Sequence, residues 1–136
     1  MLRYMFREAG VRDIPRILEL EQVLFENSMT EAVLERELEV GKGYVWVDNL
    51  HAKVLGYALV REEEGLLDLT RLGVDPEAQG TGVGRKLLRR VLALRQDTIL
   101  TVLKTNHRAL RLYLRHGFEV VGHVTSADAW VLRRQP

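Results

Sequence analysis

The stretch that decides the fold is Leu72-Gly73-Val74-Asp75-Pro76-Glu77-Ala78-Gln79-Gly80-Thr81-Gly82-Val83-Gly84-Arg85-Lys86-Leu87-Leu88. An apolar strand ends at Asp75-Pro76, a loop with three glycines follows, and the loop opens directly into an amphipathic helix. Because glycine lacks a side chain, several backbone N–H groups can converge on one point. The first N–H groups of a helix are unpaired, and the helix dipole is positive there. The stretch therefore predicts a site for the phosphate or pyrophosphate of a cofactor.

The spacing of the glycines separates the candidate cofactors. A dinucleotide fingerprint, G-x-G-x-x-G, fails because Arg85 and Leu87 stand where its last glycine belongs. A P-loop, G-x-x-x-x-G-K-S/T, fails at the same two positions. What remains is Gln79-x-x-Gly82-x-Gly84, which resembles the acetyl-coenzyme A pyrophosphate loop of the GNAT family of N-acetyltransferases. The alternative is a glycine-rich turn between a strand and a helix, with no ligand.

A second segment, residues 106–119, strengthens the resemblance. It reads as a short helix with Asn106 as its N-cap and Gly117 as the residue after its end. Four of its residues share one face at i, i+3, i+4, i+7 spacing: Ala109, Leu112, Tyr113 and His116. The segment resembles the second cofactor element of the family, Asn-x-x-Ala-x-x-Leu-Tyr-x-x-x-Gly-Phe. Both elements stand in the family's order, separated by a predicted helix and a predicted strand.

Composition excludes several other classes of protein. The 136 residues suit one domain over residues 1–136, and the net charge of +1 does not predict nucleic-acid binding. The chain has no cysteine, and its four histidines form no H-x-x-x-H or H-x-H pattern, so no metal site is expected. No apolar stretch approaches the ~20 residues of a membrane span, and no signal peptide is recognisable. We expect a cytoplasmic protein that does not bind a membrane; a homodimer is left open.

The order of predicted elements defines a fold class. Strands are expected at residues 3–9, 44–50, 54–62, 66–74, 98–105, 118–124 and 129–133. Helices are expected from Asp13 to about Glu26, from a capping box at Ser28 to Gly41, over residues 83–95, and from Asn106. This order predicts an α/β (α+β) fold, with a mixed, mostly antiparallel central sheet of six to seven strands flanked by four helices. It matches the order of elements in the GNAT family.

The resemblance implies the residues that bind acetyl-coenzyme A. The pantetheine arm is expected to pair with the backbone of Leu72 and Val74, and Gly73 between them would let the ligand approach closely. The pyrophosphate is expected at the glycine loop, which comprises Gln79, Gly80, Thr81, Gly82, Val83, Gly84 and Arg85. Asn106 touches the cofactor in the family, although its position as an N-cap explains it equally well.

Acetyl transfer to an amine also needs an acid for the leaving thiolate and a neutral amine. By its motif position Tyr113 is expected to protonate the sulfur, although it also fits a packing role in an amphipathic helix. Asp68, on the strand before the glycine loop, is the candidate base, acting through a bridging water. Two alternatives stay open: a solvated carboxylate, and an amine that arrives deprotonated without an enzyme base.

The function implied is transfer of acetyl from acetyl-coenzyme A to a primary amine, on a small molecule or a protein, by direct attack in a ternary complex. A non-catalytic acyl-coenzyme A module and a nucleic-acid binder using the arginine-rich helix are the alternatives. Within the family the chain is loosely similar to the ribosomal-protein-alanine acetyltransferases. It departs from them at Ser28-Met29 (Pro-Trp in that branch), at Thr101 (a catalytic Glu), and in having only a short turn at residues 125–128.

Overall fold

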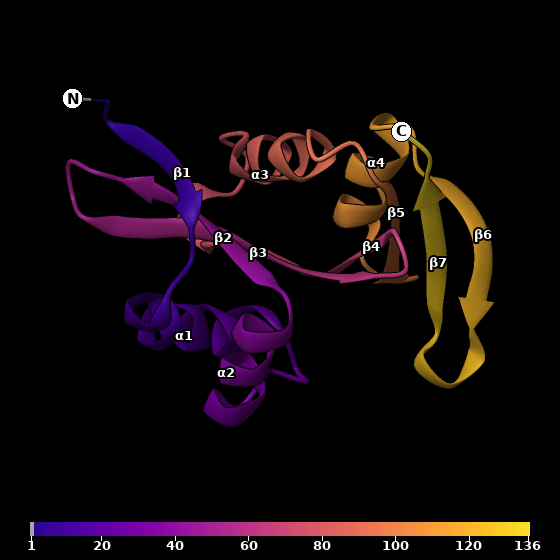
Figure 1. Cartoon of the computed structure of the whole chain (residues 1–136), viewed down its shortest axis with the longest axis horizontal. Helices are drawn as coiled ribbons and strands as arrows, with labels where there is room; N and C mark the ends of the chain where they lie inside the picture. The colour runs from indigo at the N-terminus through magenta and orange to yellow at the C-terminus, as the bar shows by residue number, and fades with distance from the viewer. Residues whose placement is uncertain (1) are drawn as a thin grey trace.

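The computed structural model describes residues 2–136, which form one seven-stranded sheet in the order β1-β2-β3-β4-β5-β7-β6 (Figure 1). The strands are β1 (Tyr4–Glu8), β2 (Lys42–Asp48), β3 (Lys53–Glu63), β4 (Leu66–Val74), β5 (Asp97–Leu103), β6 (Glu119–Val124) and β7 (Ala129–Arg134). Strands β4 and β5 pair in parallel, and every other neighbouring pair is antiparallel. The predicted mixed, mostly antiparallel sheet is therefore confirmed.

Four helices cover the two faces of this sheet (Figure 1). Helices α1 (Ile14–Leu24) and α2 (Glu31–Val40) lie on one face, and α3 (Val83–Leu92) and α4 (His107–Arg115) lie on the other. The period-2 alternation of β3 supplies both cores. Tyr57 and Leu59 pack under α1 and α2, whereas Ala58 and Val60 pack under α3 and α4. No helix within residues 2–136 is long and apolar enough to span a bilayer.

Strand β4 contains an irregularity that changes which side chains face each side of the sheet. Leu59 pairs with Arg71 and Val60 pairs with Leu69, so Thr70 is an extra residue that forms a β-bulge. The bulge reverses which face each later residue of β4 occupies. Leu69 and Leu72 therefore both pack on the α3 side, and Arg71 turns toward α1.

Beyond the bulge, β4 also loses its partner on the other side. The parallel ladder joins only Leu66, Leu67 and Asp68 of β4 to the first three residues of β5. Past Asp68 the two strands share no ladder, and the backbone of β4 is free to pair with something else. A sheet that opens in its middle is where a ligand can lie along a strand.

Several boundaries differ from the sequence expectation for local reasons. Helix α2 is capped by Thr30, whose hydroxyl accepts from the Val33 N–H at 3.3 Å; Ser28 does not cap it. The Asp13 carboxylate stands at the start of α1 but accepts from Arg7 and Gly10 and does not cap the helix. Helix α3 ends at Leu92, before Arg95. The predicted N-cap at Asn106 is confirmed by its hydrogen bond from Ala109 N–H at 3.2 Å.

Candidate active site

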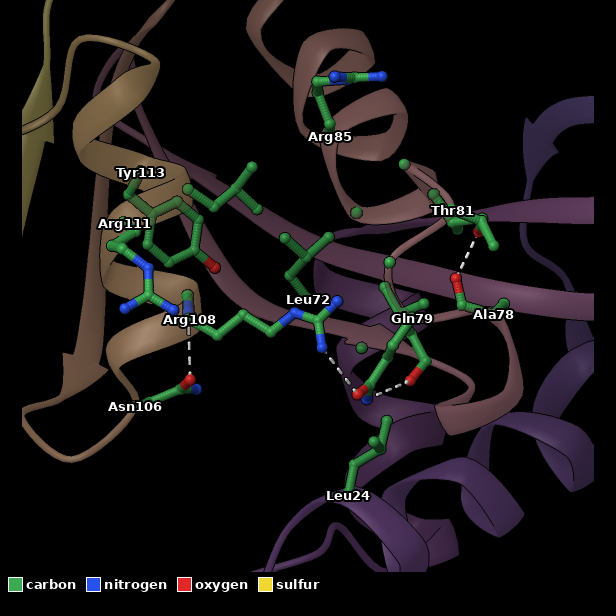
Figure 2. A pocket seen from close by; sticks show the side chains of 18 of the residues that line it. Leu24, Leu72, Ala78, Gln79, Thr81, Arg85, Asn106, Arg108, Arg111 and Tyr113 are labelled. Atoms are coloured by element: carbon green, nitrogen blue, oxygen red, sulfur yellow. Dashed lines mark hydrogen bonds between the residues drawn. The ribbon is translucent and has the colours of Figure 1, made fainter.

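A cavity of about 1020 Å³ lies where β4 has lost its partner, between the glycine loop and α4 (Figure 2). Its lining includes all the predicted cofactor-binding residues and the predicted acid: Leu72, Gly73, Val74, Gln79, Gly80, Thr81, Gly82, Val83, Gly84, Arg85, Asn106 and Tyr113. These residues come from two segments about thirty positions apart in the chain, and the tertiary structure brings them to one space. The remaining predicted site residue, Asp68, is not among the residues that line it.

The glycine loop has the backbone of an anion site. Gly80 and Gly82 have φ angles of +83° and +91°, the left-handed region that glycine adopts most easily. The first hydrogen bond within α3 runs from Lys86 N–H to Gly82 O at 3.0 Å. The N–H groups of Val83, Gly84 and Arg85 therefore have no partner in the helix. Together with the positive end of the helix dipole, they suit a pyrophosphate.

Asp75 fixes where this loop begins. One of its carboxylate oxygens accepts from Glu77 N–H at 2.9 Å, and the other lies 2.5 Å from Nη2 of Arg16 on α1. Lys53 Nζ lies 3.5 Å away. The carboxylate is buried, and burial alone would raise its pKa, but the Glu77 amide and the two cations outweigh burial and lower the pKa. Asp75 therefore stays ionised and holds the entry of the loop against α1.

A pH-dependent contribution to stability follows from this lowered pKa. A carboxyl whose pKa is lower in the folded chain stabilises it above the unfolded pKa of about 3.9, and this stabilisation is lost as pH falls through the folded value. We expect Asp75→Asn to be less stable than the parent chain at pH 7, with the difference shrinking below pH 4. Urea unfolding of both proteins from pH 7 to pH 3 measures this. A stability difference independent of pH would show that the Asp75 charge contributes nothing.

The rest of the lining carries positive charge. Arg85, Arg108, Arg111 and Arg115 line the cavity, and no carboxylate does so within the part of the chain that the structure describes. Arg108 reaches from α4 to the loop, where its Nη1 donates to Oε1 of Gln79 at 3.3 Å (Figure 2). The three arginines of α4 occupy variable positions of the sequence motif, so the motif did not reveal them. Their spacing, at 108, 111 and 115, was the available signal that they share one face.

The structure gives a different reason for Gly73 than ligand approach. A Cβ at this position would lie 2.6 Å from the ring of Tyr57, on the α1 side of the sheet. Glycine is therefore required at position 73, because the ring of Tyr57 packs against β4 on the α1 side of the sheet. The backbone of Gly73 still lines the cavity on the other side.

Tyr113 extends from α4 with its hydroxyl directed into the cavity, toward Leu72 (Figure 2). The side chain is only 7% exposed, and its ring packs edge-on against Phe118 at a centroid distance of 5.6 Å. Among residues 2–136 the hydroxyl has no hydrogen-bond partner. Burial raises the pKa of this hydroxyl above its ordinary value, so it stays protonated at neutral pH. It is a hydrogen-bond donor aimed at an open space.

Asp68 lies in a different environment. It pairs with Arg61 of β3 and Ile99 of β5, in the part of β4 that is still inside the sheet. Its neighbours Leu67 and Leu69 pack on the α3 side, so the Asp68 carboxylate projects from the opposite, exposed face. The sequence reasoning placed Asp68 on the correct strand. It could not place the carboxylate relative to the cavity, because this depends on where β4 and β5 separate.

Comparison with known proteins identifies the family of the chain. Residues 41–120 match the model of the acetyltransferase (GNAT) domain. The N-alpha-acetyltransferase RimI of Mycobacterium tuberculosis is 34% identical, with 90% of this chain and 86% of that protein covered. The chain belongs to the GNAT family. It is an N-acetyltransferase that transfers acetyl from acetyl-coenzyme A to an amine, and the reading as a non-catalytic module is not favoured.

Solved structures share the fold of this acetyltransferase. The ribosomal-protein alanine N-acetyltransferase of Escherichia coli superposes with a TM-score of 0.85 at 21% identity, covering 96% of this chain and 92% of that one. Naa50 of Arabidopsis thaliana, in complex with the bisubstrate analogue CoA-Ac-MVNAL, superposes with a TM-score of 0.83 at 19% identity, covering 99% of this chain and all of that one. The cavity described above fits a coenzyme A thioester, because it joins an anion site to an unpaired strand.

Proposed function

We propose that this acetyltransferase acts on the α-amine at the N-terminus of a peptide or protein. The observation that carries the proposal is the chemistry of the cavity lining. Within residues 2–136 the lining contains no carboxylate and no histidine, and hence no side chain suited to remove a proton from an ammonium group. The acceptor must therefore reach the cavity with much of its amine already neutral.

The two kinds of amine in proteins differ strongly in this respect. An α-amine has a pKa of about 7.7–8.0 and a lysine side chain one of about 10.4. Near pH 7.5 roughly a third of an α-amine is neutral, against about 0.1% of a lysine. The difference is a few hundred-fold in reactive species, and it favours the α-amine wherever the enzyme supplies no base. Two of the names, the N-alpha-acetyltransferase RimI and Naa50 in complex with the bisubstrate analogue CoA-Ac-MVNAL, support the same acceptor. Another relative, from Escherichia coli and 28% identical, is named a peptidyl-lysine N-acetyltransferase, so the peptide assay below includes a lysine.

The residues of the cavity have separate roles in the proposed reaction. The N–H groups of the glycine loop and the cavity arginines hold the pyrophosphate, and the backbone of Leu72 and Val74 holds the pantetheine arm. Acetyl-coenzyme A supplies the acetyl group as a thioester. The amine nitrogen bonds to the acetyl carbon, the carbon–sulfur bond breaks, and the Tyr113 hydroxyl donates a proton to the leaving sulfur. The surplus proton of the amine goes to water, and water returns a proton to the Tyr113 oxygen. The chain has no cysteine that could carry the acetyl group in between.

Two pentapeptides test the acceptor. One has a free N-terminus and no lysine, and the other has a blocked N-terminus and one lysine. We expect the free N-terminus to be acetylated with a kcat/KM at least about 100-fold higher at pH 7.5, following the ratio of neutral amine. We also expect kcat/KM to rise about tenfold per pH unit until the α-amine pKa is passed. Thiol release gives the rate, and mass spectrometry gives the acetylated position. Equal rates on the two peptides would contradict the proposal.

The same assay tests Asp68. If the amine reaches the enzyme already neutral, Asp68→Asn should give a pH–rate profile that superimposes on the parent profile. If Asp68 is instead the base, the variant should lose activity at neutral pH and recover part of it as pH approaches the pKa of the acceptor.

A further inference from the structure

The most completely buried charge described in the structure is the carboxylate of Glu21, in the third turn of α1, which is 0% exposed. Both of its oxygens are engaged. One accepts from the Tyr57 hydroxyl, and the other accepts from the Met29 N–H at 3.0 Å. Arg71 donates to the carboxylate through Nε at 3.1 Å and through Nη2 at 2.9 Å. A buried carboxylate is tolerated only when it is paired and hydrogen-bonded, and Glu21 meets both conditions.

Arg71 links Glu21 to the segment between α1 and α2. The side chain is 16% exposed, and its Nη2 also donates to the backbone oxygen of Asn27 at 2.9 Å. Its guanidinium lies over the ring of Phe25, 4.0 Å from the centroid. The pair therefore fixes the segment between α1 and α2 at three points. Arg71 holds Phe25 and Asn27, and Glu21 holds Met29.

This segment adjoins the cavity. Among the lining residues within 2–136, Leu24 and Phe25 are the ones that come from the α1 side of the sheet, and both side chains are apolar. Arg71 immediately precedes Leu72, whose backbone is assigned to the pantetheine arm. Tyr57, the third member of the cluster, fills the space beside Gly73. The buried cluster of Glu21, Tyr57 and Arg71 therefore supports both the cavity-lining end of β4 and the apolar wall at Phe25.

The location of this wall suggests what it contacts. The phosphates of the cofactor belong with the glycine loop and the arginines of α4. Leu24 and Phe25 belong to neither of these elements and carry no charge, and the apolar wall that they form suits the acceptor.

We propose that Glu21 and Arg71 are positioning residues that hold Phe25, and with it residues 25–29, as the acceptor-side wall of the cavity. The acceptor that fits is a peptide whose first side chain is apolar and packs on Phe25. This inference rests on the proposed function, since it assumes a peptide acceptor. Neither residue touches the reacting atoms. Their effect is on where the acceptor binds, and it should appear in the KM for the peptide.

Arg71→Lys is the test, because lysine keeps the positive charge but cannot bind Glu21 through two nitrogens and Asn27 at the same time. We expect the KM for a pentapeptide with a free N-terminal alanine to rise about tenfold or more, with the Kd of acetyl-coenzyme A changed less than about twofold. Hydrogen exchange at residues 25–30 should become faster, while exchange in α3 and α4 stays the same.

Arg7→Lys is the matched control. Arg7 also pairs with a buried carboxylate through two nitrogens, at 2.8 and 2.9 Å, but its partner Asp13 lies at the opposite end of α1 and away from the cavity. We expect this control to lose stability without any change in the KM for the peptide. Glu21→Gln, which preserves the shape of the side chain, provides a second variant if Arg71→Lys fails to fold. It should raise the KM in the same direction.

Two outcomes would overturn the inference. The first is an unchanged KM in a destabilised Arg71→Lys enzyme. The second is a Kd for acetyl-coenzyme A that rises by the same factor as the KM, because the cluster would then support only the cofactor strand. If the parent enzyme acetylates no peptide, the proposed function fails. The exchange experiment still decides the positioning role in that case, since equal exchange at residues 25–30 in parent and variant would exclude it.

Discussion

Gly82→Asp is expected to weaken the binding of acetyl-coenzyme A strongly while the chain stays folded. Gly82 is the N-cap of α3, has a φ of +91° and lines the cavity. A Cβ there would lie 3.1 Å from Nη2 of Arg85. The carboxylate would thus occupy the anion site and pair with a cation that the pyrophosphate needs. We expect the affinity to fall by roughly 100-fold or more, or about 2.8 kcal/mol.

The fold should survive this substitution. A residue other than glycine in the left-handed region costs about 1–2 kcal/mol, and aspartate is among the residues that tolerate it best. That cost is small beside the 5–15 kcal/mol that stabilises a typical domain. Calorimetry with acetyl-coenzyme A measures the binding, and thermal unfolding measures the stability.

Gly65 offers a matched control for the backbone strain. It has a φ of +80° in the turn between β3 and β4, and a Cβ there would meet nothing within 4 Å. Gly65→Asp should therefore lose comparable stability and bind acetyl-coenzyme A as the parent does. Gly82→Asn separates charge from size, and we expect its affinity to lie between those of the parent and Gly82→Asp. Unchanged affinity in a folded Gly82→Asp protein would refute the anion site.

Tyr113→Phe is expected to lower turnover by about 10²-fold while leaving the affinity for acetyl-coenzyme A nearly unchanged. The substitution keeps the ring that packs against Phe118 and removes only the hydroxyl. Because the hydroxyl has no protein partner within residues 2–136, its removal leaves no buried group unsatisfied, and stability should hardly change. The whole effect should therefore fall on protonation of the leaving sulfur.

The pKa of Tyr113 adds a second signature. An acid must be protonated to act, and burial raises this pKa above its ordinary value near 10. Turnover of the parent enzyme should therefore show no alkaline loss due to Tyr113 up to about pH 10. Stopped assays of thiol release across the pH range measure this. Tyr44→Phe is the control, since Tyr44 stacks on Phe6 of β1 and does not line the cavity. Full activity in Tyr113→Phe would leave Tyr113 with a packing role alone.

The glycine loop could be predicted from the sequence because its conformation is local. Gly80 and Gly82 take left-handed angles that few other residues tolerate. The amphipathic pattern of residues 83–92 predicts the helix that follows them. The cap at Asn106 was predicted for the same reason, since donor and acceptor lie three residues apart. Signals of this kind need no knowledge of the rest of the chain.

Other features of the site could not be predicted in this way, because they depend on residues far apart in the sequence. Glu21 shares the helical spacing of the apolar residues of α1, but nothing near it in the sequence identifies its partner Arg71, which lies 50 positions away. The bulge at Thr70 turns Arg71 toward α1. The apolar residues of β4 shift across it from Leu67 and Leu69 to Leu72 and Val74, but this shift does not identify the partner of Arg71. The requirement for Gly73 arises from Tyr57 on the neighbouring strand.

The sequence by itself determined the family, the order of the elements and the position of the glycine loop, because these depend on contacts between residues close in the chain. The tertiary structure alone decided which side chains face the cavity. It brought Arg108 and Tyr113 across to the glycine loop, left Asp68 on the far face, and buried Glu21 against Arg71. The physical reason is that these outcomes depend on strand register and on where β4 parts from β5, and both are fixed only when the whole core has packed.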